Sequence, residues 1–358
     1  MAENREKRTV RIGTRKSALA VVQTRLVAEA IEKTCSRAKA ELVTRETMGD
    51  RILNKPLLEF GGKGVFVSEF EQGLTDGTID LAVHSAKDMP MELGEGLAIL
   101  AVPEREDPRD VLVVRKGTVL SGRDEVVVGT SSPRRAVQIR ELGSKLWDRA
   151  AVRCEVLRGN VNTRLRKLGE GGYDAIILAA AGLKRLGFLD SREEVSQGEF
   201  QEDGRFFQYQ YLDCESFIPA GGQGILAVEG RESDEEIREI CGRLEDRDAR
   251  ICLETERKVL RLLNAGCHEP IGVYTRMAET GEIELFGICG RGGIIRRTHR
   301  KAAAELAGEL AEAAAAELAG EMEMPTAGEP AGRRVSVGQT GELPENGQET
   351  SRKTERSS

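Results

Sequence analysis

The sequence of 358 residues has little of the material from which common catalytic and metal sites are built. Its three histidines, His84, His268 and His299, lie far apart, so neither a Ser-His-Asp triad nor a histidine-rich metal site is expected. The seven cysteines are odd in number and scattered, and no two of them form a C-x-x-C pair. This pattern argues against a disulfide framework or a zinc ribbon.

Two further absences bear on location and partners. No run of about 18 uncharged apolar residues occurs, so we expect no transmembrane helix and no membrane partner. The first residues, MAENREKRTVRIGTR, are charged and lack the apolar stretch of a secretory signal, which favours the cytoplasm. The 53 Lys and Arg residues against 60 Asp and Glu residues give a net charge of −7, which rules out a polybasic coat for nucleic acid.

Strand and helix patterns alternate through the first half of the chain, as in α/β proteins. Val10 and Ile12 indicate a strand, helical spacing continues to Ala30, and a second strand is expected at 41–44. These elements predict a βαβ unit with two parallel strands. Further strands are expected at 78–84, 126–130, 153–157 and 173–179, and further helices at 65–74, 134–142 and 161–168.

The second half of the chain is less regular. Residues 191–212 are polar and rich in Gln, which predicts an irregular excursion. Residues 325–358 have no aromatic residue and many Gly, Ser, Thr and Pro, which predicts a disordered tail. The elements in between indicate a third, α+β domain: helices within 234–263, strands around Ile271 and Ile283, and a helix near 302–322.

Arginines gather in the turns of the two α/β units. Most of them fall close to the carboxyl ends of predicted parallel strands, where open α/β sheets place ligands. Planar guanidinium groups and helix N-termini suit carboxylates, so the pattern predicts a pocket for a polyanion. Phosphate would fit by charge alone, but neither G-x-x-x-x-G-K-[ST] nor G-x-G-x-x-G occurs. The arginines in question are Arg15, Arg134, Arg135, Arg158, Arg164 and Arg185.

Lys87 and Asp88 follow an apolar predicted strand, and Pro90 then ends regular structure. A carboxylate at a strand end can be partly desolvated and can serve as acid, base or stabiliser of a developing cation. An isolated Asp in a turn is usually structural, but the surrounding arginines favour a catalytic role here.

Two loop motifs allow two interpretations each, and two others indicate crossings between domains. Cys267 lies in a Gly- and Pro-containing turn, where a thiol is either inert or an exposed nucleophile or covalent anchor. The run Gly61-Gly62-Lys63-Gly64 opens a helix and is either a mobile lid or a flexible loop. The motifs at 107–110 and 221–224 predict interdomain crossings, where hinges belong.

Taken together, seven motifs resemble those of the porphobilinogen deaminase family, also called hydroxymethylbilane synthases. The resemblance runs from about residue 8 to residue 320. Each motif alone is weak, whereas their order and spacing are specific. The motifs are RIGTRKSALA from Arg11 with Gln23, GGKGVF from Gly61, HSAKDMP from His84, REDPRD from Arg105, GTSSPRR from Gly129, LRGNVNTRL from Leu157, and Gly266-Cys267.

The resemblance implies two periplasmic-binding-protein-like α/β domains joined by a hinge, and a C-terminal α+β domain. Domain 1 would comprise 8–103 with 213–232 and carry the cleft and a lid that includes Lys63 and Phe66. Domain 2, 104–212, would supply the arginine-rich cleft wall. Domain 3, 233–324, would carry the cofactor cysteine, and 325–358 would be the disordered tail.

The resemblance further implies a monomeric transferase of porphyrin biosynthesis without a metal. It would join four porphobilinogen molecules head to tail, with loss of ammonia, onto one covalent dipyrromethane cofactor, and release the linear tetrapyrrole by hydrolysis. Cys267 would hold the cofactor by a thioether, and Asp88, beside Lys87, would stabilise the cation formed as ammonia leaves. Cofactor positions would be Lys87, Asp88, Thr130, Ser132, Arg134, Arg135, Arg158 and Arg164, and substrate positions Arg15, Ser17, Gln23, Arg158, Arg164 and Arg185.

Two rival interpretations come from other functional classes. A non-catalytic, two-lobed carboxylate-binding protein would be expected to carry a signal peptide and would have no use for Cys267. An RNA-binding protein that used residues 158–167 would interleave stacking aromatics with its basic residues, and that segment has none. We therefore expect no nucleic-acid partner.

Overall fold

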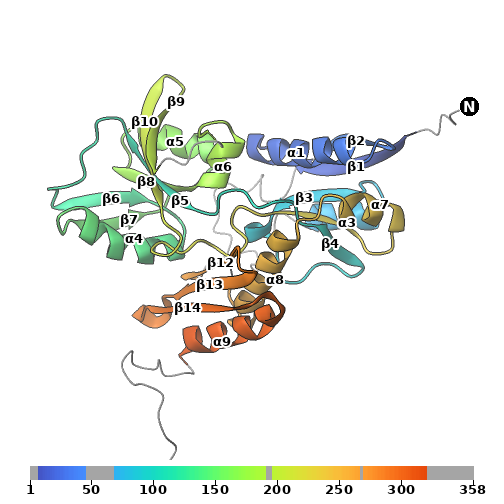
Figure 1. Ribbon diagram of the computed structural model, residues 1–358. Helices are drawn as coiled ribbons and strands as arrows, with labels where there is room; N and C mark the ends of the chain where they lie inside the picture. Colours follow the sequence, from blue (N-terminus) through green and yellow to red (C-terminus); the bar gives the residue numbers. More distant parts are fainter. Residues whose placement is uncertain (1–6, 46–67, 191–195, 267–268, 321–358) are drawn as a thin grey trace, which may run out of the picture. The chain divides into compact units, whose positions relative to one another are not determined.

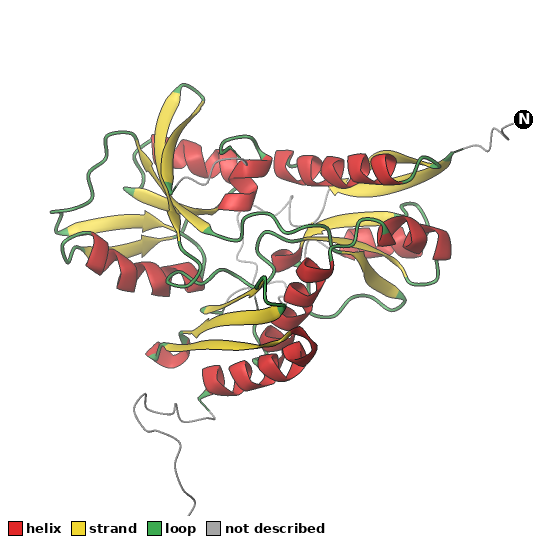
Figure 2. Cartoon of the chain, in the orientation of Figure 1, coloured by secondary structure: helices red, strands yellow, loops and turns green. Residues whose placement is uncertain are grey.

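The computed structural model describes residues 7–45, 68–190, 196–266 and 269–320 (Figure 1). Within these ranges the strands form three sheets, and helices accompany each of them (Figure 2). No helix in the described ranges has the length and apolar character needed to cross a lipid bilayer. The lid positions Lys63 and Phe66 and the cofactor position Cys267 lie outside the described residues.

Five strands and three helices make up the first sheet and its cover: β1 (Arg8–Arg15), β2 (Ala38–Arg45), β3 (Leu81–Ser85), β4 (Leu97–Ala101), β11 (Leu226–Arg231), α1 (Ala18–Thr34), α3 (Ser68–Thr75) and α7 (Glu235–Gly242). The strand order is β2-β1-β3-β11-β4. The predicted parallel pairing of β1 with β2 is confirmed, with Ile12 opposite Leu42. β11 comes from much later in the chain and lies antiparallel between β3 and β4. Val27 and Ile31 of α1 pack on this sheet.

Six strands and three helices make up the second sheet and its cover: β5 (Asp110–Arg115), β6 (Glu125–Gly129), β7 (Ala151–Glu155), β8 (Ala175–Ala179), β9 (Gln197–Glu202), β10 (Arg205–Leu212), α4 (Pro133–Leu146), α5 (Val161–Gly169) and α6 (Ala180–Arg185). The order is β7-β6-β8-β5-β10-β9. β6 runs parallel to β7 and to β8, whereas β5 is antiparallel to β8 and β10. The helix α4 begins where Ser132 accepts a hydrogen bond from the Arg135 N–H and Pro133 takes the first turn.

The prediction of an irregular excursion over 191–212 is wrong for its described part. β9 and β10 form an antiparallel hairpin that extends the second sheet beside β5. Asp203 and Gly204 both have positive φ angles and make the tight turn. Alternate residues of β10, Phe207 and Tyr209, are buried against Phe200 of β9. Aromatic packing therefore orders a segment whose overall polarity indicated a loop.

The C-terminal part consists of a three-stranded antiparallel sheet with helices on it: α8 (Arg247–Leu262), β12 (Ile271–Met277), β13 (Glu282–Cys289), β14 (Arg296–Ala303), α9 (Ala307–Ala319) and the short 3₁₀ turns η3 (Arg291–Gly293) and η4 (Ala304–Leu306). Sequence analysis predicted α8, α9 and two strands but missed β14. The sequence of β14, RRTHRKAA, has no apolar alternation. Its identity as a strand follows from its antiparallel pairing with β13. The expected fold class, two α/β sheets followed by an α+β part, is confirmed.

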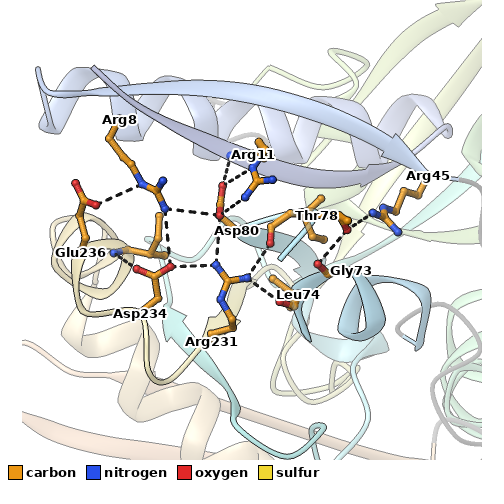
Figure 3. A network of polar contacts seen from close by, with 12 residues as sticks. Arg8, Arg11, Arg45, Gly73, Leu74, Thr78, Asp80, Arg231, Asp234 and Glu236 are labelled. Atoms are coloured by element: carbon orange, nitrogen blue, oxygen red, sulfur yellow. Dashed lines mark hydrogen bonds and ion pairs between the residues drawn. The ribbon is translucent and has the colours of Figure 1, made fainter. Parts of the chain in front are cut away.

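A polar network links the three central strands of the first sheet, β1, β3 and β11, at one end of these strands (Figure 3). Asp80, just before β3, is 1% exposed and accepts hydrogen bonds from the Arg11 backbone N–H and guanidinium at 2.8–3.0 Å. Arg231, at the end of β11, donates to Asp80 at 3.3 Å and to the carbonyl oxygens of Leu74 and Ile79. Burial opposes ionisation of Asp80, but the hydrogen bonds from Arg11 outweigh it and hold the pKa of this carboxyl below its usual value.

Candidate functional site

Lys87 and Asp88 lie directly after the first sheet, in the 3₁₀ turn η2 (Ala86–Asp88) that follows β3. Asp88 is exposed, whereas Lys87 is half-buried. Burial lowers the pKa of Lys87 to about 8; the charges of Arg135 and Arg134 act in the same direction, and Asp88 and Asp110 act against it. The end of this strand therefore presents an accessible carboxylate beside an ammonium group that loses its proton more readily than an ordinary lysine.

The side chain of Gln223 connects Lys87 to the second sheet. Lys87 Nζ donates to Gln223 Oε1 at 3.2 Å. Gln223 Nε2 in turn donates to Asp110 Oδ1 at 3.0 Å and to the Pro108 carbonyl oxygen at 2.7 Å. Asp110 is the first residue of β5, so the Gln223 side chain bridges the turn after β3 in the first sheet and the start of β5 in the second.

Asp110 is the carboxylate that neutralises Arg134 and Arg135. Arg134 NH1 lies 2.8 Å from Asp110 Oδ2, and Arg135 NH2 lies 2.7 Å from Asp110 Oδ1. Burial opposes ionisation of Asp110, but the two guanidinium charges outweigh it and hold the pKa of this carboxyl well below its usual range. Both arginines are themselves buried, with exposed fractions of 4% and 7%. Two of the predicted carboxylate-binding arginines thus already have an internal carboxylate partner.

The predicted hydroxyl positions lie where α4 begins. Thr130 is buried, and its Oγ1 accepts a hydrogen bond from the Ser132 N–H at 3.1 Å. Ser132 Oγ accepts from the Arg135 N–H at 3.4 Å. These hydroxyl groups fix the turn that presents Arg134 and Arg135 at the helix start.

Arg158 and Arg164 lie at the loop and helix that follow β7. Arg158 is exposed, while Arg164 is half-buried and donates from Nε to the Gly159 carbonyl oxygen at 2.8 Å. Burial lowers the pKa of Arg164 to about 10; repulsion from Arg135 adds to this effect, and attraction to Asp88 opposes it. The Asp88 carboxylate, which follows β3 of the first sheet, is therefore close enough to Arg164 to favour its charged form.

Gln23 and Ser17 are the remaining predicted polar contributions of α1. Ser17 caps this helix by accepting a hydrogen bond from the Ala20 N–H at 3.4 Å. Gln23 is buried, and its Nε2 donates to Ser85 Oγ at 2.9 Å, at the end of the strand that leads to Lys87. Arg15, the last residue of β1, is half-buried.

Arg185, the last residue of α6, contacts the crossing between the sheets. Its NH2 group donates to the Gly224 carbonyl oxygen at 2.6 Å. Burial lowers the pKa of Arg185 to about 10, and the charge of Glu106 opposes this effect. The structure thus places Arg185 against the crossing segment 221–224 rather than in contact with Asp110.

The described cysteines have the character of core residues. Cys35, Cys241, Cys252 and Cys289 are buried and Cys154 is half-buried, as expected for small apolar side chains. Burial raises the pKa of Cys241 to about 12 and that of Cys252 to about 11, so both stay protonated at neutral pH. Within the described ranges there is also no cluster of three or more His, Cys, Asp or Glu side chains that could hold a metal.

The described part of this site joins cations and carboxylates from both sheets. Lys87 and Asp88 come from the first sheet, and Arg135 and Arg164 come from the second. Such a set can bind a ligand with several carboxylates and can stabilise positive charge that develops beside Asp88. Sequence analysis assigned no role to Asp110 or Gln223 beyond membership of two crossing motifs, and those motifs were the signal that could have identified them.

Two family models match the sequence. "Porphobilinogen deaminase, dipyromethane cofactor binding domain" matches residues 10–239, and "Porphobilinogen deaminase, C-terminal domain" matches residues 250–323. A porphobilinogen deaminase of Brevibacillus brevis is 44% identical over 78% of this chain and 84% of its own length. One of Syntrophobacter fumaroxidans is 46% identical with the same coverage. A solved amino-acid ABC transporter extracellular-binding protein of Bacillus subtilis is 12% identical over 72% of this chain and 97% of its own, with a TM-score of 0.35.

Proposed function

The chain belongs to the porphobilinogen deaminase family, and from this premise we propose which of its residues carry the family's reaction. The protein is a transferase, hydroxymethylbilane synthase, and its cofactor is dipyrromethane. It condenses four porphobilinogen molecules head to tail with loss of ammonia and then releases the linear tetrapyrrole by hydrolysis. This relationship does not favour the alternative of a non-catalytic carboxylate-binding protein.

The observation that supports our residue assignment is the link between charged groups of the two sheets. Lys87 contacts Asp110 through Gln223, and Asp110 pairs with the two arginines of α4. Arg135 contributes to the lowered pKa of Lys87, and Asp88 opposes the lowering of the pKa of Arg164. Such coupling requires that these side chains lie near one another. A small substrate with an acetate and a propionate on one pyrrole ring would therefore find cations from both sheets close to the Asp88 carboxylate.

We assign the catalytic role to Asp88 with Lys87 beside it. The Asp88 carboxylate is exposed and can stabilise the positive charge that develops on the substrate as ammonia leaves. Lys87 can act as a cation toward ring carboxylates and, because burial lowers its pKa to about 8, can also give up a proton near neutral pH. Substrate carboxylates are assigned to Arg15, Ser17, Gln23, Arg158, Arg164 and Arg185.

The donor set of the described residues fits dipyrromethane, whose two rings carry four carboxylates. When bound, this group supplies the pyrrole carbon to which the first substrate is added. We assign its side chains to Lys87, Asp88, Thr130, Ser132, Arg134, Arg135, Arg158 and Arg164, and its thioether to Cys267. Lys63 and Phe66 are assigned to the lid. Asp110 already pairs with Arg134 and Arg135, and their NH1 groups donate to the carbonyl oxygens of Ile218 and Ile177. These two arginines would therefore contribute mainly by their positive charge.

The covalent assignment is tested by the intact mass of the purified protein beside its Cys267→Ala variant. We expect a mass excess equal to two deaminated porphobilinogen units in the parent alone. If the parent lacks the excess, it is incubated with porphobilinogen and weighed again, so that apoprotein is distinguished from a protein that never binds the group. An equal excess in Cys267→Ala would refute the assignment to this thiol.

The catalytic assignment is tested by Asp88→Asn. This variant should retain the cofactor mass and the fold, yet its porphobilinogen consumption should fall by about 10²-fold or more, because the amide cannot stabilise the developing cation. Arg164→Ala should chiefly raise KM. Turnover by Asp88→Asn close to that of the parent would remove this residue from the mechanism.

We further propose that the protein is a cytoplasmic monomer without a membrane or nucleic-acid partner. The family's small-molecule substrate requires no macromolecular partner, and the net charge of −7 disfavours nucleic acid. We also propose domain 1 as 8–103 with 213–232, domain 2 as 104–212, domain 3 as 233–324 and a disordered tail from 325 to 358. Light scattering coupled to size exclusion tests the monomer, and limited proteolysis tests the boundaries.

A further inference from the structure

Gln223 is completely buried in the loop that leads back into the first sheet. Gly222 and Gly224, on either side of it, have φ angles of +76° and +88°. A Cβ atom on Gly222 would lie 3.0 Å from the Lys87 backbone nitrogen, and one on Gly224 would collide with the Glu106 carbonyl oxygen. The two glycines thus let the loop approach both Lys87 and the segment from Glu106 to Asp110 that leads into β5. This approach places the Gln223 side chain between Lys87 and that segment.

The carboxamide of Gln223 has every hydrogen-bonding group in use. Its two N–H groups donate to Pro108 O and Asp110 Oδ1, and its oxygen accepts from Lys87 Nζ. The opposite amide orientation would aim N–H groups at an ammonium and an oxygen at two other oxygens. The partners therefore dictate the orientation, and a side chain in this position cannot serve only to fill space.

The backbone at Gln223 is held by the C-terminal part of the chain. Arg105 Nε donates to the Gln223 carbonyl oxygen at 2.9 Å, and Arg105 NH1 lies 2.7 Å from Glu256 Oε1 of α8. Glu256 Oε2 also accepts from the Gly222 N–H at 2.6 Å. Because Glu256 is fully buried, these contacts fix the loop firmly.

We propose that Gln223 is a positioning residue of the active site, which orients the ammonium group of Lys87 and connects it to the Asp110 pair of Arg134 and Arg135. The inference rests on the proposed role of Lys87. It gives that role a physical basis, because Lys87 and the two arginines then form one connected unit instead of three separate side chains. Displacement of the crossing loop would change the environment of Lys87 at once.

Burial has the largest influence on how Lys87 titrates, and several side chains in the described part of the chain modify it. Asp88 and Asp110 favour its charged form, and Arg134 and Arg135 disfavour it. The Gln223 oxygen accepts a hydrogen bond from the ammonium group and so favours the charged form as well. Removal of that oxygen should lower the titration midpoint of Lys87, and replacement by a carboxylate should raise it.

The test compares Gln223→Met with Gln223→Glu in the full-length protein. Competitive acetylation with acetic anhydride, read by mass spectrometry at Lys87 across pH 6–10, gives the titration midpoint in each variant. We expect a shift of roughly half to one pH unit downward for Met and upward for Glu. Gln208→Met, which removes a β10 glutamine that donates to Glu199 of β9, should leave the midpoint unchanged.

A purely structural role would lower the melting temperature of both variants and leave the Lys87 midpoint in place, and that result would overturn the proposal. If Gln223→Glu does not fold because its carboxylate faces Asp110, the proposal is tested by Gln223→Met alone. A downward shift of the Lys87 titration midpoint in that variant supports it, and an unchanged midpoint overturns it. The titration needs no substrate. Failure of the parent to consume porphobilinogen would therefore refute the proposed function without affecting this test, and the alkaline limb of the kcat/KM profile should follow the Lys87 midpoint in active variants.

Discussion

Asp80 and Asp110 are two almost fully buried aspartates that face arginines in very different surroundings. The arginines that contact Asp80 (Figure 3) are partly exposed, at 37% for Arg11 and 20% for Arg231, so water can hydrate them. The arginines around Asp110 are 4% and 7% exposed and have no such recourse. The same residue types therefore form a fastening at one end of the central strands of the first sheet and a buried charge cluster beside Lys87.

The difference has a consequence for the role of each cluster. Asp80 joins β1, β3 and β11, and no ligand position has been assigned near it. Asp110 reaches Lys87 through Gln223, so a change of its charge affects the turn that carries Lys87 and Asp88. Four measurements can test or refine this contrast.

Asp110→Asn should have the largest effect, because it leaves two buried guanidinium groups without a counter-charge. We expect the free energy of unfolding to fall by about 3–5 kcal/mol. Urea unfolding followed by circular dichroism measures this loss. A cost no greater than that of Asp80→Asn would contradict the distinction between the two clusters.

Asp80→Asn should have an intermediate effect. It weakens several hydrogen bonds, but Arg11 and Arg231 can be hydrated where they are, so we expect a loss of about 1–3 kcal/mol. The same urea experiment applies, and porphobilinogen turnover should stay near that of the parent in this variant. A drop in turnover at full folding would show that the fastening also affects the site.

The pH dependence of stability should differ between the two variants by a smaller amount. Both carboxyl groups have a folded-state pKa below the unfolded value of about 3.9, so their stabilisation is present above that value and is lost as the pH falls through the folded pKa. Each Asn variant should flatten the decline below about pH 5. Asp110→Asn should flatten it more, which unfolding curves between pH 2 and pH 7 would show.

Arg166→Ala should have the smallest effect. Arg166 and Glu170 form an i,i+4 pair on α5 and are 50% and 46% exposed. Such pairs contribute about 0.3–0.5 kcal/mol, and salt screens them. A loss above 1 kcal/mol would mean that solvent exposure does not predict how much an arginine ion pair contributes to the free energy of unfolding of this protein.

Sequence patterns predicted the elements that form by local rules. The βαβ start was predictable because strand alternation and helical spacing follow one another directly, and Lys87 was placed at a strand end for the same reason. β14 was missed because its sequence carries no apolar alternation. The hairpin at 197–212 was missed because its turn signal, Asp203-Gly204, was outweighed by the polarity of the segment.

The site was predicted only where its residues belong to local motifs. Lys87, Asp88 and the turn arginines follow strands, and that position can be inferred from sequence. The partnership of Asp110 and Gln223 could not be inferred in this way, because these residues are more than a hundred positions apart and meet only where the two crossings come together. Arg134 and Arg135 likewise donate to the carbonyl oxygens of Ile218 and Ile177, which are also distant in sequence.

The placement of β11 sets the order in which the sheets can be completed during synthesis of the chain. β11 begins at Leu226, yet it lies between β3 and β4, whose residues all come before position 102. A nascent chain that has emerged only as far as Ala101 has a β4 with no neighbour to pair with. Contacts of such sequence separation form slowly, because the loop must close first. The first sheet is therefore completed only after all strands of the second sheet have left the ribosome.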